Sequence, residues 1–234
     1  MNPMKKWLLV LLLAGCAAAP VSRDRIGQIV ANPDRSDADR TNDIRRKPAE
    51  MLAFIGVREG ITALDVAAGG GYTTELIARA AGPTGRVYGQ TSRPDPRQRL
   101  AERNKVVGNI VPIVRPFENP APPDVPLDLV TLMFNYHDLA NFDRASMNRS
   151  VFAALKPGGL YVIADHSGRA GTGISESNTL HRIEEAFLRK EVEAAGFQLV
   201  EEGTFLRNPG DPRDRETPEP PQPKDEFVLK FRRP

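Results

Sequence analysis

Residues 63–71 read ALDVAAGGG, a short apolar run that contains one acid, Asp65, and passes into three consecutive glycines. A helix-prone stretch from Tyr72 to Ala81 follows and is closed by Gly82. Glycines between a strand and a helix let the main chain approach a ligand closely, and the first N–H groups of the helix lack partners inside it. The stretch therefore predicts a strand, a tight turn and a helix that together bind a small ligand.

The spacing of the glycines narrows the class of ligand. Dinucleotide sites of this kind have the pattern G-x-G-x-x-G. Gly69 and Gly71 supply the first two glycines, but Thr74 stands at the third position. A dinucleotide-dependent oxidoreductase is therefore a poor fit; S-adenosylmethionine is the other ligand class bound at such turns.

Strand-like and helix-like segments alternate along the rest of the chain. We expect strands at residues 63–66, 86–89, 110–114, 127–134, 160–164, 197–200 and 227–231, and the clearest helices at 49–55, 72–81 and 180–195. Alternation of this kind is typical of βαβ units with a parallel sheet covered on both faces. Pro112 lacks an N–H donor, so the third strand should lie at a sheet edge. The proline-rich residues 207–224 should form a surface excursion.

Two motifs resemble those of the class I S-adenosylmethionine-dependent methyltransferases. Residues 65–71 match the first motif of that family, acid-x-Gly-x-Gly-x-Gly, with Ala67 at the first glycine, and Leu155-Lys156-Pro157-Gly158-Gly159-Leu160 is similar to its lead into the fifth strand. The resemblance covers roughly residues 50–231. It implies a Rossmann-like α/β fold, with a seven-stranded, mostly parallel sheet in the order 3-2-1-4-5-7-6 and helices on both faces. More narrowly, residues 46–51, 135–139 and 165–167 are similar to a group of exported bacterial predicted methyltransferases.

The resemblance implies S-adenosylmethionine as cofactor and a set of residues that bind it. That set is Asp65, Ala67, Gly69, Gly70, Gly71, Gln90, Phe117, Glu118 and Asn135. The family normally ends its second strand with an acid that holds the ribose hydroxyls, but this chain has Gln90 there. Glu118 is the acid we nominate near the adenosyl group, with Phe117 for stacking; a surface acid beside a core phenylalanine is the alternative interpretation of that pair.

All three histidines are expected at one end of the sheet. His137 follows the fourth strand, His166 follows the fifth, and His181 lies in the first turn of the expected helix 180–195. Ligands of open α/β sheets bind beyond the carboxyl ends of the strands. We predict His137 as a catalytic base oriented by Asp138, with His166 able to exchange roles with it. A divalent metal held by the three histidines and a carboxylate is the alternative, but no compact metal signature is present, so no metal is predicted.

The first sixteen residues are typical of an export signal. Lys5 and Lys6 precede the apolar run 7–13, and Leu13-Ala14-Gly15-Cys16 resembles a bacterial lipobox, whose cysteine is acylated after cleavage. An ordinary signal peptide with an incidental cysteine is the alternative. We expect a signal peptide at 1–15, a tether with weak helix and an N-terminal extension at 16–47, and a methyltransferase domain at 48–234. The implied location is the bacterial cell envelope, lipid-anchored and facing the periplasm or the exterior.

Composition limits the partners. The chain has 234 residues, 32 Lys+Arg against 30 Asp+Glu, and one cysteine, so it lacks the positive surplus of a nucleic-acid binder and any disulfide framework. The predicted function is methyl transfer from S-adenosylmethionine to a small-molecule acceptor, with the membrane contacted only through the anchor. The alternative is a non-catalytic lipoprotein that keeps the fold to bind a ligand or act as a scaffold. The oligomeric state is not predicted.

Overall fold

The computed structural model describes residues 19–216 and 224–234. The predicted lipidation site, Cys16, and the whole predicted signal peptide, residues 1–15, lie outside the described residues. In the described chain, the first contacts of the fold are made by a bridge between Pro20 and Arg58 and by Val21, whose N–H donates to the carbonyl of Val57 at 2.9 Å. Residues 20 and 21 are therefore attached to the segment between α3 and β1.

A seven-stranded sheet organises the molecule. Its strands are β1 (Thr62–Val66), β2 (Arg86–Thr91), β3 (Ile110–Val114), β4 (Leu127–Met133), β5 (Leu155–His166), β6 (Gln198–Gly203) and β7 (Glu226–Arg232). They lie in the order β3-β2-β1-β4-β5-β7-β6, and only β7 runs antiparallel to its neighbours. The predicted order is confirmed, and Pro112 lies in β3 at the edge, as its missing donor requires.

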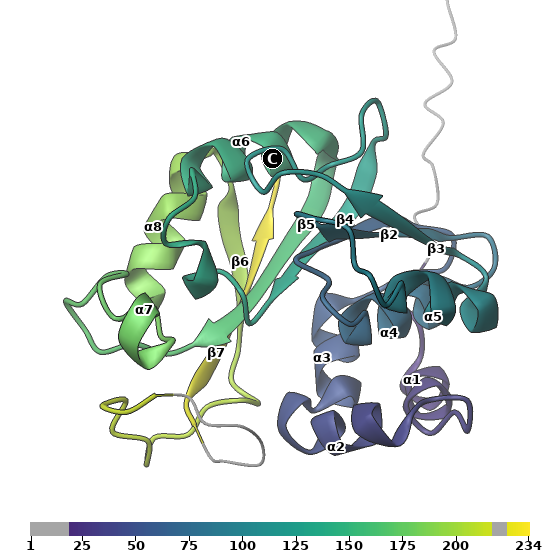
Figure 1. Ribbon diagram of the computed structural model, residues 1–234, viewed down its shortest axis with the longest axis horizontal. Coiled ribbons are helices and arrows are strands. Elements are labelled where there is room, and N and C mark those ends of the chain that lie inside the picture. The colour runs from purple at the N-terminus through teal and green to yellow at the C-terminus, as the bar shows by residue number, and fades with distance from the viewer. Residues whose placement is uncertain (1–18, 217–223) are drawn as a thin grey trace, which may run out of the picture.

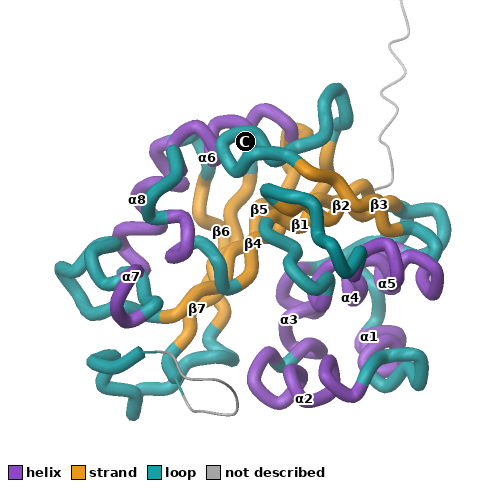
Figure 2. Tube along the Cα trace, in the orientation of Figure 1, coloured by secondary structure: helices purple, strands orange, loops and turns teal. Residues whose placement is uncertain are grey.

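Helices cover both faces of the sheet (Figures 1 and 2). The helices are α1 (Arg23–Val30), α2 (Asp37–Arg46), α3 (Pro48–Ile55), α4 (Tyr72–Ala81), α5 (Arg99–Val107), α6 (Arg144–Ala154), α7 (Ser177–Leu180) and α8 (Glu185–Ala194), with a 3-10 turn, η1, at His137–Leu139. One core joins α1, α3, α4 and Leu100 of α5 to one face, and a second core joins α6 and α8 to the other. The α4 bounds agree with the prediction, and α5 and α6 complete the alternation.

The N-terminal extension is folded in its described part. Residues 17–47 are expected to be a tether with weak helix, but α1 and α2 each begin at a serine that caps the helix: Ser22 accepts from Arg25 N–H, and Ser36 accepts from Asp39 N–H. Ile26 of α1 is buried in the same core as α3 and α4. This part of the extension is therefore part of the domain.

The helix expected at 180–195 is interrupted at its start. His181 adopts φ 50°, in the left-handed region, and ends α7 rather than opening α8. The following residues run beside the end of β5, because Ile183 N–H donates to His166 and Gly168 N–H donates to Ile183. The expectation that His181 lies in the first turn of the long helix was wrong, since pairing with β5 replaces that turn.

The described part of the proline-rich excursion is tied down by ion pairs. Arg182, 1% exposed, contacts Asp211 at 2.9 Å, and Arg213 contacts the buried Asp225 at 2.7 Å. Buried charges are seldom left unpaired because their desolvation is costly. Residues 207–216 thus pack against the end of β5 instead of projecting freely.

Candidate active site

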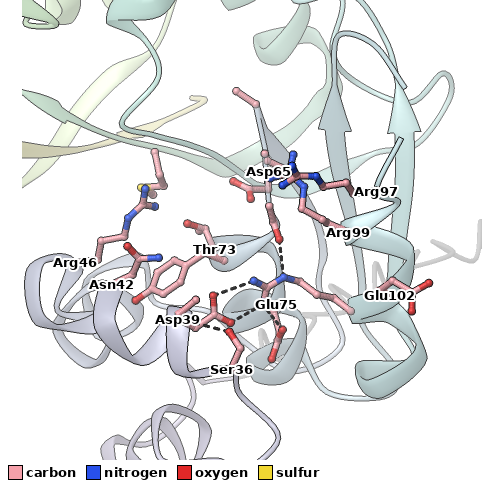
Figure 3. A pocket seen from close by; sticks show the side chains of 18 of the residues that line it. Ser36, Asp39, Asn42, Arg46, Asp65, Thr73, Glu75, Arg97, Arg99 and Glu102 are labelled. Carbon is pink, nitrogen blue, oxygen red and sulfur yellow. Dashed lines mark hydrogen bonds and ion pairs between the residues drawn. The ribbon is translucent and has the colours of Figure 1, made fainter. Parts of the chain in front are cut away.

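A cavity of about 720 Å³ opens at the carboxyl end of β1. Its walls are the glycine turn and residues of α2, α4 and α5 (Figure 3). Within the described chain, the N–H groups of Gly69 and Gly70 donate to no protein acceptor. Ala67 adopts φ 54°, which glycine tolerates better than alanine, so the backbone keeps the conformation suited to the missing first glycine. The predicted ligand-binding turn is therefore present, with free donors beside a cavity.

Asp65 fixes the start of this turn. It is 2% exposed, and its two carboxylate oxygens accept from the hydroxyls of Thr74 at 2.6 Å and Thr131 at 2.7 Å. Burial raises the pKa of Asp65 to about 6, against the opposing effect of those two hydrogen bonds. Thr74, which stands where a dinucleotide site has glycine, is therefore used to hold the acid.

Helix α2 supplies one wall of the cavity. The guanidinium of Arg103 from α5 donates to Asp39 of α2 at 2.7 and 2.9 Å and to the carbonyl of Gly70 at 2.6 Å, and it also contacts Glu75 of α4. Figure 3 shows Asp39 on the α2 side of the cavity, bonded also to Ser36. One arginine thus joins three helices to the glycine turn, a contact that sequence patterns alone did not indicate.

Arg46, the last residue of α2, brings a positive charge into the cavity wall. Its guanidinium carbon lies 5.1 Å from the centre of the Tyr72 ring and 4.8 Å from that of Phe134. Its Nε is buried without a hydrogen-bond partner, and no carboxylate of the described chain lies within ion-pair distance. Burial and the neighbouring Arg45 lower the pKa of Arg46 to about 10. It remains charged in neutral solution and is available to an anionic ligand group.

Four of the predicted cofactor residues do not line this cavity: Gly71, which directly precedes α4, and Gln90, Phe117 and Glu118. Gln90 is fully buried: its Oε1 accepts from Ala67 N–H at 2.9 Å and its Nε2 donates to the carbonyl of Arg115 at 2.6 Å. Phe117 packs edge-on against Phe142, and neither Phe117 nor Glu118 lines the cavity. Gln90 supports the glycine turn from behind and has no polar group left for a ribose.

Asn135 links the cavity to the histidines. It lines the cavity and donates from Nδ2 to the carbonyl of Met133 at 2.8 Å. Beyond it, the ring centres of His137 and His166 lie 5.3 Å apart, and those of His137 and His181 lie 5.7 Å apart. The three histidines therefore lie together beyond the ends of β4 and β5, but none of them lines the cavity, so the expectation that all three border the ligand crevice is not met.

The partners of His137 differ from those predicted. Its Nδ1 lies 2.6 Å from the fully buried Asp165, and its Nε2 lies 3.2 Å from Asp138. Asp165 therefore orients the ring, and Asp138 faces its outer nitrogen. Although burial opposes charging, Asp165 and Asp138 raise the pKa of His137 to about 10. A charged imidazole donates a proton and accepts none, so the predicted base role has no support from this charge state and stays a prediction.

His166 occupies a different environment. It is 6% exposed, it stacks on Phe134 with ring centres 5.5 Å apart, and its Nδ1 lies 2.9 Å from Glu226. Burial holds the pKa of His166 well below its ordinary value. The environment of His137 favours the charged imidazole, whereas that of His166 favours the neutral one, and His166 is enclosed by protein. The two histidines therefore differ in charge state and access, and their predicted exchange of roles has no support from these environments.

Sequence comparison places a general methyltransferase domain on this region. The family described as "Methyltransferase domain" matches residues 63–159. The ubiquinone/menaquinone biosynthesis C-methyltransferase UbiE of Hydrogenovibrio crunogenus is 32% identical over 120 residues, which are 50% of this chain and 46% of that protein. The protein of the same name from Pseudomonas putida strain GB-1 is 35% identical over the same shares of the two chains. The chain spans about half the length of the curated relatives it matches.

Solved structures share the whole fold at low sequence identity. A SAM-dependent methyltransferase from Aquifex aeolicus superposes with a TM-score of 0.63 at 17% identity, over 90% of this chain and 98% of that one. The [4+2]-cyclase SpnF also gives a TM-score of 0.63 at 17% identity, over 81% and 83% of the two chains. The fold therefore occurs in a protein named for methyl transfer and in one named for another reaction.

Proposed function

We propose that this chain is a class I S-adenosylmethionine-dependent methyltransferase and that it transfers a methyl group from that cofactor to a small-molecule acceptor; its fold and its match to a methyltransferase domain support the proposal. The observation that carries the proposal is the cavity at the glycine turn, at the carboxyl end of β1. In open α/β sheets this is the place where ligands bind.

The groups on the cavity wall fit the charges of S-adenosylmethionine. The cofactor has a carboxylate, an ammonium group and a sulfonium. Arg46 and the free N–H groups of Gly69 and Gly70 suit the carboxylate, and the carboxylates of Asp39 and Asp65 lie on the same wall as counter-charges. Gln90 supplies no ribose contact here, so we assign it a supporting role and expect the ribose to be held differently from the family pattern.

When bound, the cofactor supplies an electrophilic methyl carbon on sulfur. Methyl transfer would leave the electron pair of the broken carbon–sulfur bond on the sulfur, so the protein would not have to supply an electron acceptor. The task of the protein is then chiefly to align the acceptor with the methyl group. Asn135 lies on the cavity and His137 lies just beyond it, where Asp165 and Asp138 already contact its two ring nitrogens. We therefore expect the acceptor to be aligned by Asn135 and the cavity wall, and not by a free ring nitrogen of His137.

The acceptor is proposed to be a small or lipid-associated molecule. The sequence carries nearly equal numbers of basic and acidic residues, which disfavours a nucleic-acid acceptor. Two matched relatives are named for ubiquinone and menaquinone biosynthesis, and this supports a small acceptor without identifying it.

Binding of the cofactor is the decisive measurement. Isothermal titration calorimetry of the fragment that begins at Ala17 should show one molecule of S-adenosylmethionine bound per chain. A separate titration should show one molecule of its demethylated product bound per chain. Absence of binding of both at millimolar concentration would overturn the proposal. The second candidate is a ligand-binding module without catalysis, which Gln90 favours because it stands where the family pattern has a ribose-binding acid. Turnover of an acceptor that is lost in Asp65→Ala would exclude it.

We also propose that the protein is exported and acylated at Cys16. The proposal rests on the lysines, apolar run and lipobox-like residues at the start of the sequence. Among the helices of the described residues, none has the length and apolar character needed to cross a membrane. Metabolic labelling with a palmitate analogue should mark the wild type and leave Cys16→Ser unmarked; equal labelling of the two would contradict the proposal.

A further inference from the structure

Three metal-ligating side chains converge beside the cavity. His137 and Asp138 come from η1 after β4, and His181 comes from the end of α7. Asp138 Oδ1 lies 3.2 Å from His137 Nε2 and 3.5 Å from His181 Nδ1, and all three potential ligand atoms lie within 4.8 Å of one another. Residues 43 positions apart in sequence, 138 and 181, thus present their polar atoms to one point.

The spacing suits a single metal ion. Zinc binds nitrogen and oxygen ligands at about 2.0–2.2 Å, so two ligands of a tetrahedral site lie about 3.3–3.6 Å apart. The two contacts of Asp138 Oδ1 with the imidazoles are close to that range before any ion draws the ligands inward. Two imidazoles with one carboxylate also form a donor set that suits zinc, iron, manganese and cobalt.

The second coordination shell is already in place. Asp165 is fully buried, and its Oδ1 lies 2.6 Å from His137 Nδ1. The backbone N–H groups of His137 and His166 both donate to the Asp165 carboxylate at 2.8 Å, so the orientation of this carboxylate is fixed. A histidine that binds metal typically donates its other ring N–H to a carboxylate in this way, which directs the lone pair of the outer nitrogen to the metal. Here the outer nitrogen is Nε2, the atom that faces Asp138.

The site is open on one side. The His137 side chain is 4% exposed, whereas those of Asp138 and His181 are 48% and 42% exposed. An ion here would rest on a buried ligand and face solvent across two half-exposed ones. Three protein ligands and an open position are typical of reactive metal sites rather than of closed structural ones.

We propose that His137, Asp138 and His181 bind a divalent transition-metal ion, with Asp165 as the positioning residue and an open coordination position for water or a ligand oxygen. This set differs from the alternative considered from sequence, because His166 faces Phe134 and Glu226 while Asp138 takes its place. The proposal does not depend on methyl transfer, since it concerns metal binding by the chain alone.

The test is titration of the untagged fragment that begins at Ala17, after removal of metal with a chelator. Calorimetry with Zn²⁺ should give one ion per chain, and Co²⁺ should give the visible absorption of a site with nitrogen and oxygen ligands. Failure of both ions to bind at millimolar concentration would overturn the proposal, because an imidazole between two carboxylates would then be satisfied by its proton alone.

Variants distinguish this site from adventitious binding. His181→Asn removes an imidazole, and asparagine tolerates the left-handed backbone that His181 adopts. We expect His181→Asn and Asp138→Asn to weaken Zn²⁺ binding at least 10-fold, and Asp165→Asn to weaken it about 10–100-fold. Asp124→Asn, an exposed change away from the cluster, is the matched control and should bind as the wild type does.

Folding and binding are read separately. Thermal unfolding without metal should be similar for the wild type, His181→Asn and Asp124→Asn, whereas a given concentration of Zn²⁺ should raise the midpoint of the wild type and Asp124→Asn by more than that of His181→Asn. Equal Zn²⁺ affinity in the wild type, His181→Asn and Asp138→Asn would place the ion elsewhere and refute the proposed ligands.

Discussion

At the scale of single residues, Gly70 and Gly71 differ in what a side chain would meet. A Cβ on Gly70 would have Arg99 Nη1 as its nearest neighbour, at the ordinary distance of 3.5 Å. A Cβ on Gly71 would lie 2.8 Å from both Leu100 and Arg103, at a residue whose φ is 83°. A side chain at Gly70 would therefore affect only the cavity, whereas a side chain at Gly71 would clash with α5 and disturb the fold.

This difference gives a paired prediction. The free energy of unfolding of Gly70→Ala should lie within about 1 kcal/mol of that of the wild type. The variant should nevertheless bind S-adenosylmethionine at least 10-fold more weakly, because the added methyl group occupies space in the ligand cavity. Gly71→Ala should lose about 2–3 kcal/mol of stability from the clash and the left-handed backbone. Urea unfolding and calorimetry on both variants test it; unchanged binding by Gly70→Ala would place the cofactor elsewhere.

The raised pKa of Asp65 predicts a particular pH dependence of stability. Because burial raises its pKa from 3.8 to about 6, the folded protein holds the Asp65 proton more tightly than the unfolded chain does. The stabilisation is full below the unfolded pKa and is lost as the pH rises through about 6. A difference of about two pKa units corresponds to about 3 kcal/mol.

Comparison with Asp65→Asn isolates this contribution from other titrating groups. The free energy of unfolding of the wild type, minus that of Asp65→Asn, should increase by up to about 3 kcal/mol as the pH falls from 7 towards 4. Denaturant unfolding at several pH values measures it. A difference that stays constant, or decreases on acidification, would contradict the raised pKa.

At the scale of elements, the contact between α2 and α5 depends on the buried pair Asp39–Arg103. Arg103→Met leaves Asp39, which is 3% exposed, without its counter-charge and should cost about 3 kcal/mol of stability. In a double-mutant cycle with Asp39→Asn, we expect a coupling energy of about 1–2 kcal/mol.

A control pair lies on the same helix. Glu102 and Lys105 of α5 also form an ion pair, but their side chains are 57% and 70% exposed. Their cycle should give a coupling below about 0.5 kcal/mol, because solvent screens an exposed pair. If the two cycles gave equal coupling energies, α2 would be held by apolar contacts and not by Arg103.

The secondary-structure elements also show which features of the fold can be predicted from sequence patterns and which cannot. The glycine turn, helix α4 and the edge position of Pro112 depend on local rules that a pattern carries, and the structure confirms them. The break at His181 was missed because it depends on pairing between Ile183 and the end of β5, a contact between distant parts of the chain.

The same limit applies to the site. Asp65, Ala67, Gly69, Gly70 and Asn135 all lie on the cavity, as their motifs indicated. Arg46 was not predicted to lie at the site, because nothing in its local sequence shows that α2 folds back over the glycine turn. Gln90 was assigned to the ligand from its position after a strand, but its amide is used within the backbone, which only coordinates reveal.

At the scale of the whole molecule, α1 and α2 are predicted to be indispensable. Ile26 and Ile29 are 4% and 2% exposed, and burial of two such side chains contributes about 3–6 kcal/mol. A chain of residues 48–234 should therefore unfold at much lower urea concentration than one of residues 17–234. It should also fail to bind S-adenosylmethionine, because Arg46 and the α2 wall are gone.

A shorter deletion is the control for this truncation. A chain that starts at Pro20 keeps the bridge to Arg58 and both helices, and it should match the chain that starts at Ala17 in stability and binding. If the chain that starts at residue 48 were as stable as the chain that starts at Ala17, the N-terminal extension would be dispensable for folding.

The bridge between Pro20 and Arg58 has a consequence for how an acylated protein would lie on a lipid surface. Pro20 is four positions after Cys16, and an extended chain spans at most about 14 Å over four residue steps. A compact domain of this size has a radius of gyration of about 17 Å, so the linker between Cys16 and Pro20 is shorter than the radius of the domain that it attaches. Such a protein cannot tumble freely: the side bearing Pro20 and Arg58 stays against the headgroups, and its search for a lipid-soluble acceptor becomes two-dimensional.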